Sequence, residues 1–119
     1  MKTYQDLIVW QKSIDLVVNV YKLTQQFPKE EIYGLTSQIN RAAISIPSNI
    51  AEGRMRGGNV EFKRFLFIAL ASGAELETQL FLSKKLPKME KLDYNKVDSL
   101  LEEIMRMLNK LISQLGPSA

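Results

Sequence analysis

The side chains best suited to chemistry in this sequence lie between residues 41 and 64. Residues 45–53 read Ser-Ile-Pro-Ser-Asn-Ile-Ala-Glu-Gly and hold two hydroxyls, an amide and a carboxylate. Arg41 lies one helical turn before them. A serine nucleophile beside a cation is the reaction centre that these residue types suggest.

A serine nucleophile needs a general base, and the chain has neither His nor Cys in its 119 residues. The commonest base, the commonest metal ligand and any thiolate are therefore missing. Gly57-Gly58 lacks the Lys and Ser/Thr of a phosphate-binding loop. Glu75 and Glu77 are two residues apart, so on a helix they point to different sides. We predict a protein that is not an enzyme and has no cofactor or metal, in which the serines bond to carbonyl groups freed by Pro47.

Basic residues are concentrated in two short segments. Residues 54–64 hold four of them against Glu61, and residues 84–91 hold another four against Glu90, in a chain of net charge +3. Such clusters suit an anionic partner such as RNA or DNA, although they also serve solubility. No recognition-helix motif is present, so contacts would go to phosphates. The predicted nucleic-acid-binding residues are Arg41, Arg54, Arg56, Lys63 and Arg64.

Apolar residues recur at intervals of three and four in four segments of the chain. This period predicts helices at about 6–26, 31–55, 59–84 and 93–115. Short connections between helices of this length indicate one all-α domain over residues 1–119, an antiparallel up-and-down four-helix bundle. Residues that favour helix starts or ends mark the boundaries: Asp6, Pro28, Glu30 or Glu31, Gly57, Gly58, Asn59, Asp93, Gly116 and Pro117.

The second predicted helix contains Pro47 at its centre. A proline lacks the N–H donor and presses on the carbonyl of Ala43, so the helix either kinks or restarts with Asn49 as cap. We predict a kink, and we expect Pro47→Ala to alter assembly before it alters binding. A polar stripe on this helix is open to three interpretations, namely a solvated face, a subunit interface or a binding surface. Its members are Gln38, Arg41, Ser45, Ser48, Glu52 and Arg56.

The first and third helices carry more apolar surface than one bundle core covers. The first has two stripes, one from Leu7 through Trp10 and Ile14 to Tyr21 and another from Val9 to Phe27. The third has no charge over residues 65–74. We expect Trp10, Tyr21 and Tyr33 in a core, and the excess apolar surface favours an oligomer.

The uncharged runs of the chain are short. The two longest, residues 42–51 and 65–74, have ten residues each, whereas a membrane span needs about 20. The first residues show no apolar signal region. We therefore expect a cytoplasmic protein without a membrane partner.

The segment from "DLIVWQKS" through "YGLTSQ" and "SIPSNIAEG" to "EFKRFLFIALASGAELETQL" resembles the 23S rRNA-intervening-sequence protein family. The likeness covers residues 6–82, and the fourth helix matches only in pattern. It implies a bacterial cytoplasmic four-helix bundle that forms a ring-shaped homo-oligomer, a homopentamer. The chain is more distantly similar to the accessory barrel protein of diversity-generating retroelements, a pentamer that works with a reverse transcriptase and nucleic acid. Asn40 stands where the family commonly has a basic residue, so a strongly basic groove along this helix is not implied.

Two functional hypotheses follow. The first is a non-enzymatic oligomeric bundle that binds RNA or DNA through its basic residues. The alternative is an oligomeric scaffold that docks a protein partner and has no nucleic-acid role.

Overall fold

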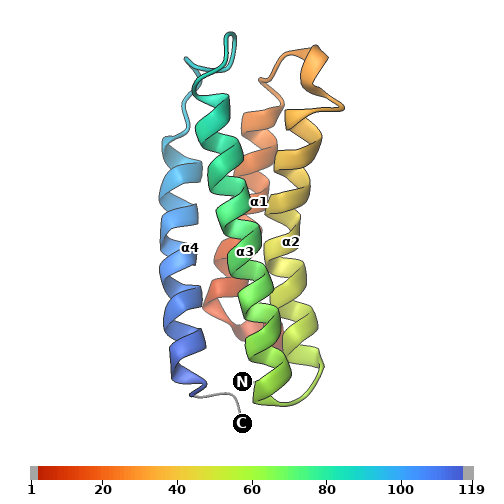
Figure 1. Cartoon of the computed structure of the whole chain (residues 1–119), viewed down its shortest axis with the longest axis vertical. Coiled ribbons are helices and arrows are strands. Elements are labelled where there is room, and N and C mark those ends of the chain that lie inside the picture. Colours follow the sequence, from red (N-terminus) through yellow and green to blue (C-terminus); the bar gives the residue numbers. More distant parts are fainter. Residues whose placement is uncertain (1–2, 117–119) are drawn as a thin grey trace.

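The protein is a bundle of four α-helices in a computed structural model that describes residues 3–116 (Figure 1). The helices are α1 (Ile8–Thr24), α2 (Leu35–Met55), α3 (Asn59–Ser83) and α4 (Asn95–Gln114). Two short 3₁₀ helices, η1 (Tyr4–Asp6) and η2 (Lys29–Glu31), precede α1 and α2. The described chain contains no strand, and its extents are 47 × 22 × 22 Å. The predicted all-α class is confirmed.

Successive helices run in opposite directions, and each packs against its neighbours in the chain (Figure 1). α1 also packs against α4, which closes the bundle. The α2–α3 turn, η1 and the end of α4 lie at one end of the rod, and the two longer connections lie at the other. This is the predicted antiparallel up-and-down arrangement.

The core is built from the apolar stripe of each helix. Ile46 of α2, Leu66 of α3 and Ile104 of α4 are fully buried, as the helical spacing predicted. In α1 the stripe that includes Val9 and Phe27 is buried, while part of the other stripe remains at the surface. Tyr21 of α1 is 40% exposed, so its predicted core position is wrong. Tyr33 is 98% exposed, so its predicted core position is wrong as well. It lies in the α1–α2 connection, where the helical period no longer fixes a face.

The first, second and fourth predicted helix starts are early by two to four residues, because the capping side chains act in the preceding turns, whereas α3 starts at residue 59 as predicted. Asp6 belongs to η1, where it forms a capping box with Thr3. The carboxylate of Glu31 in η2 accepts the Leu35 N–H at 3.2 Å. The cap position of α3 is occupied by Gly58, with Asn59 as the first helical residue. Asp93 Oδ1 accepts the Asn95 N–H at 2.9 Å. α4 therefore begins at Asn95, two residues after the predicted start at residue 93. Pro117 lies outside the described residues.

One helix has the length and composition of a membrane span. Within the described residues this is α3, and 44% of its apolar window is buried inside the bundle. Core helices of globular proteins share this property. The contacts of α3 with α2 and α4 account for that burial.

α2 runs unbroken through Pro47, which is buried, so the helix does not restart at Asn49. The neighbouring polar groups do not bond as predicted. Asn49 Nδ2 donates to the Ser45 carbonyl at 2.8 Å and to Ser45 Oγ at 2.9 Å. The hydroxyls of Ser45 and Ser72 lie 2.8 Å apart, so this serine links α2 to α3. The kink at Pro47 stays a prediction.

The Ser45–Ser72 hydrogen bond is open to a double-mutant cycle. Ser72 is only 9% exposed, and Ser45→Ala would leave its hydroxyl unpaired at a cost of about 1–3 kcal/mol. The double variant Ser45→Ala/Ser72→Ala should lose less than the sum of the single losses. Urea unfolding at one protein concentration measures all four variants, with Ser48→Ala, at an exposed position of the same segment, as a control. Strictly additive losses would show that the two hydroxyls are not coupled.

Candidate nucleic-acid interface

The five predicted basic residues fall into two separate places. Arg54 lies in the last turn of α2 and Arg56 directly follows that helix, while Lys63 and Arg64 lie in the first turns of α3. These four residues share one end of the rod, and we call them the basic end. Arg41 lies earlier on α2, about 20 Å from Arg54 at 1.5 Å per residue. The structure therefore does not unite Arg41 with the others.

The α2–α3 turn brings the basic end together. Gly57 has φ +72° and Gly58 has φ +123°, backbone conformations that L side chains rarely adopt. Next to the turn, Gly53 of α2 packs against α3 so closely that a Cβ there would lie 2.5 Å from the Phe65 Cβ. Left-handed glycines and a close helix contact thus place cations from two helices side by side.

Two arginines of the basic end share the Glu61 carboxylate. Arg64 Nε donates to Glu61 Oε2 at 2.8 Å, and an Arg56 nitrogen lies 3.9 Å from Glu61 Oε1. Arg56 also pairs with Glu52 at 2.9 Å. The hydrogen bond from Arg64 lowers the pKa of Glu61, and the same bond raises the pKa of Arg64. Both groups therefore stay ionised at neutral pH.

The aromatic ring of Phe65 forms cation–π contacts with the guanidinium groups of Arg56 and Arg64. The Arg64 guanidinium carbon lies 4.5 Å from the ring centroid of Phe65, and that of Arg56 lies 5.1 Å from it. A cation over an aromatic face is held by the ring quadrupole. Helical spacing alone predicts a buried Phe65 and no role beside the arginines, because the pairing depends on the turn between the two helices.

The other two residues of the basic end, Lys63 and Arg54, differ in the contacts that their side chains make within the chain. Lys63 Nζ donates to the Gly116 carbonyl, so it ties α3 to the end of α4. Arg54 is half-buried, and its side chain has no ion pair or hydrogen bond among residues 3–116. Exposed ion pairs such as Arg56–Glu52 are weak and screened by solvent. A phosphate could displace the carboxylates and bind the arginines in a bidentate manner.

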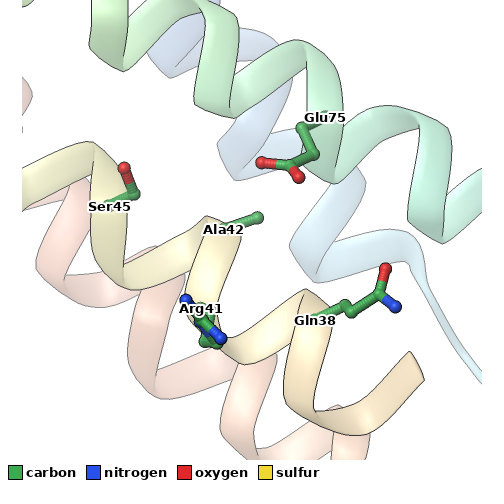
Figure 2. A pocket seen from close by; sticks show the side chains of 5 residues that line it. All are labelled: Gln38, Arg41, Ala42, Ser45 and Glu75. Atoms are coloured by element: carbon green, nitrogen blue, oxygen red, sulfur yellow. The ribbon is translucent and has the colours of Figure 1, made fainter. Parts of the chain in front are cut away.

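Arg41 lines a separate hollow between α2 and α3 with a volume of about 360 Å³ (Figure 2). The other lining residues are Gln38, Ala42, Ser45 and Glu75. Glu75 turns its carboxylate toward α2, and within the described part of the chain it forms no ion pair with Arg41. A carboxylate across the hollow makes this position less favourable for a phosphate than the basic end. No local sequence pattern connects Arg41 with Glu75, because their proximity depends on the register of α2 against α3.

The residues of the polar stripe of α2 do not share one environment in the structure. Ser45 faces α3, whereas Arg41, Ser48 and Glu52 are exposed in the single chain. No group of three or more acidic residues that could hold a metal ion occurs among residues 3–116. The arrangement offers cations and hydrogen-bond donors to an anionic partner.

Comparison with a family model gives a match over most of the chain. A search of the curated proteins finds no match to the chain. A family model described as 23S rRNA-intervening sequence protein matches residues 5–110, which include all four helices almost completely. The chain belongs to the 23S rRNA-intervening sequence protein family.

Proposed function

We propose that this protein is a non-enzymatic, self-assembling four-helix bundle that binds RNA or DNA through its basic end. The observation that carries the proposal is the gathering of four cations from two helices against only two carboxylates, Glu52 and Glu61. Arginine presents a planar fork of donors that matches phosphate oxygens. Such contacts hold the nucleic-acid backbone without reading its sequence.

Assembly would strengthen an interaction that is weak in one chain. A homo-oligomer repeats the basic end once per subunit, and the family resemblance implies a ring of five. Linked sites bind the same polymer with an effective concentration that raises the overall affinity. The exposed apolar side chains of α1 and α3, among them Ile14 and Phe67, support assembly because monomers rarely expose such surface.

A salt titration with labelled single-stranded RNA tests the nucleic-acid proposal. We expect binding at low ionic strength that weakens steeply with salt, with a slope of log K against log salt of about −0.7 per phosphate contact. Fluorescence anisotropy measures it, and DNA of the same sequence shows whether the sugar matters. No binding at low ionic strength, or binding that salt leaves unchanged, would contradict the proposal.

The second candidate function is a scaffold that docks a protein partner. The observation that favours it is the apolar groove between α1 and α2, which includes Trp10 and Ile44. Affinity capture from the native lysate with added nuclease separates the two functions. A partner retained after nuclease treatment supports the scaffold, whereas loss of all partners supports binding through nucleic acid.

A further inference from the structure

A hollow with a volume of about 250 Å³ lies where the end of α1, η2 and the first turns of α2 meet. Tyr21 and Phe27 line it with aromatic rings, and Thr24, Thr36 and Asn40 line it with polar side chains. None of the described residues that line it is acidic. The α1–α2 connection lies at the opposite end of the rod from the basic end, so this hollow is separate from the proposed nucleic-acid interface (Figure 1). We call it the end hollow.

The amide of Asn40 is held in place by a buried threonine. Thr24 is only 4% exposed, and its hydroxyl donates to Asn40 Oδ1 at 2.9 Å. The Asn40 Nδ2 group keeps both of its N–H donors, because it forms no hydrogen bond within residues 3–116. A fixed amide therefore offers two donors at the wall of the end hollow.

The hydroxyl of Thr36 is a further donor without a partner. Its Oγ1 is buried and forms no hydrogen bond in the described part of the chain. Buried polar groups in native proteins are nearly always paired, so an orphan of this kind marks a missing partner. Threonine occupies two rotamers in helices. The hydroxyl can therefore turn into the end hollow without breaking a hydrogen bond.

Lys29 adds a positive charge beside these donors. It lines the end hollow, and its ammonium group has no ion pair or hydrogen bond among residues 3–116. The two acids that follow it in the sequence are engaged elsewhere. Glu30 pairs with Lys88 at 3.1 Å, and the carboxylate of Glu31 accepts the Leu35 N–H. The end hollow thus combines unused donors, a cation and aromatic walls, and it lacks a carboxylate of its own.

We infer that the end hollow binds a small aromatic carboxylate. The carboxylate oxygens accept from Asn40 Nδ2 and from the Thr36 hydroxyl, and Lys29 neutralises the charge. The ring lies against Tyr21 and Phe27, since aromatic rings pack in offset or edge-to-face pairs. An engineered cavity of about 150 Å³ accepts benzene, so a ring fits in the larger end hollow. This inference goes beyond the proposed function and does not depend on it.

Benzoate is the probe that tests the site. Benzyl alcohol supplies the ring without the charge, and acetate supplies the carboxylate without the ring. Saturation-transfer NMR follows the signals of each compound, so the measurement works for a monomer and for a large assembly. We expect saturable binding of benzoate, and binding of benzyl alcohol and of acetate that is weaker by about tenfold or more, because each lacks one set of contacts.

Three substitutions place the probe in the end hollow. Asn40→Asp exchanges the amide donors for a second carboxylate at almost unchanged size, and should weaken benzoate binding by about tenfold or more. Thr36→Val removes a hydroxyl that has no partner, so thermal stability should be kept while benzoate binds about two to ten times more weakly. Lys29→Met should weaken binding as well. Its matched control is Lys22→Met, which removes an exposed lysine of α1 outside the end hollow and should leave binding unchanged.

Several results would overturn the inference. These are no saturable signal from benzoate with the unmodified protein, or equal binding of benzoate and either control compound. Benzoate binding that survives both Asn40→Asp and Thr36→Val would lie elsewhere, and an equal loss in Lys22→Met and Lys29→Met would reflect overall charge. Circular dichroism and thermal unfolding verify that each variant is folded. None of these results bears on RNA binding by the basic end, which the salt titration tests separately.

Discussion

The double variant Arg54→Glu/Arg56→Glu should bind single-stranded RNA about ten to a hundred times more weakly than the unmodified protein at low salt, a loss of roughly 1.4–3 kcal/mol. The two substitutions replace both α2 cations of the basic end by carboxylates beside Glu52 and Glu61. Backbone phosphates would then meet repulsion where they now meet donors. The slope of log K against log salt should also become less steep, because the variant protein neutralises fewer phosphates.

The matched control is Lys91→Glu/Lys96→Glu, which changes the net charge equally at the opposite end of the rod. Anisotropy titrations of both double variants, with circular dichroism as a check of helix content, should show weakened binding only at the basic end. An equal loss in both variants would show that overall charge, and not this site, governs binding.

Gly53→Ala should destabilise the bundle by about 1–3 kcal/mol, the usual cost of overpacking a tight contact. A Cβ at Gly53 would lie 2.5 Å from the Phe65 Cβ, which is fixed to the α3 backbone. The two helices would have to separate at the point where the basic end is assembled. Since Phe65 also supports Arg56 and Arg64, binding should weaken together with stability.

Gly73→Ala serves as the comparison, with an expected change within about 1 kcal/mol, because the better helix propensity of alanine offsets part of the crowding. A Cβ there would meet the thioether of Met105, a flexible and half-buried side chain that can move away. Thermal unfolding is measured at one protein concentration, because assembly makes Tm concentration-dependent. A larger loss for Gly73→Ala than for Gly53→Ala would contradict this account of the α2–α3 contact.

The fold was largely predictable because helical periodicity reports which residues share a face. The stripe through Ile39, Ile46 and Ile50 and the stripe through Leu66 and Leu76 are buried as predicted. The periodicity does not define where a helix starts, since Asp6 and Glu31 favour a 3₁₀ turn as readily as an α-helix start. Tyr33 fits the spacing of a core residue, yet it lies in a connection.

The candidate site was predictable only in its residue types. Arg54, Arg56, Lys63 and Arg64 lie close in sequence on both sides of two glycines, so their meeting at one end follows from the turn. The separation of Arg41 follows from the rise of α2, which also carries Arg54. The position of Glu75 across the hollow from Arg41 and the Ser45–Ser72 bond depend on the register of α2 against α3, which no local pattern contains. The function assigned to these residues stays a prediction.

The mass of the purified protein in solution tests the central claim of a self-assembling bundle most directly. Size-exclusion chromatography with light scattering should give a multiple of the 13.6 kDa chain mass, and for the expected pentamer five times that mass, about 68 kDa. A clean 13.6 kDa species at micromolar concentration would contradict the account.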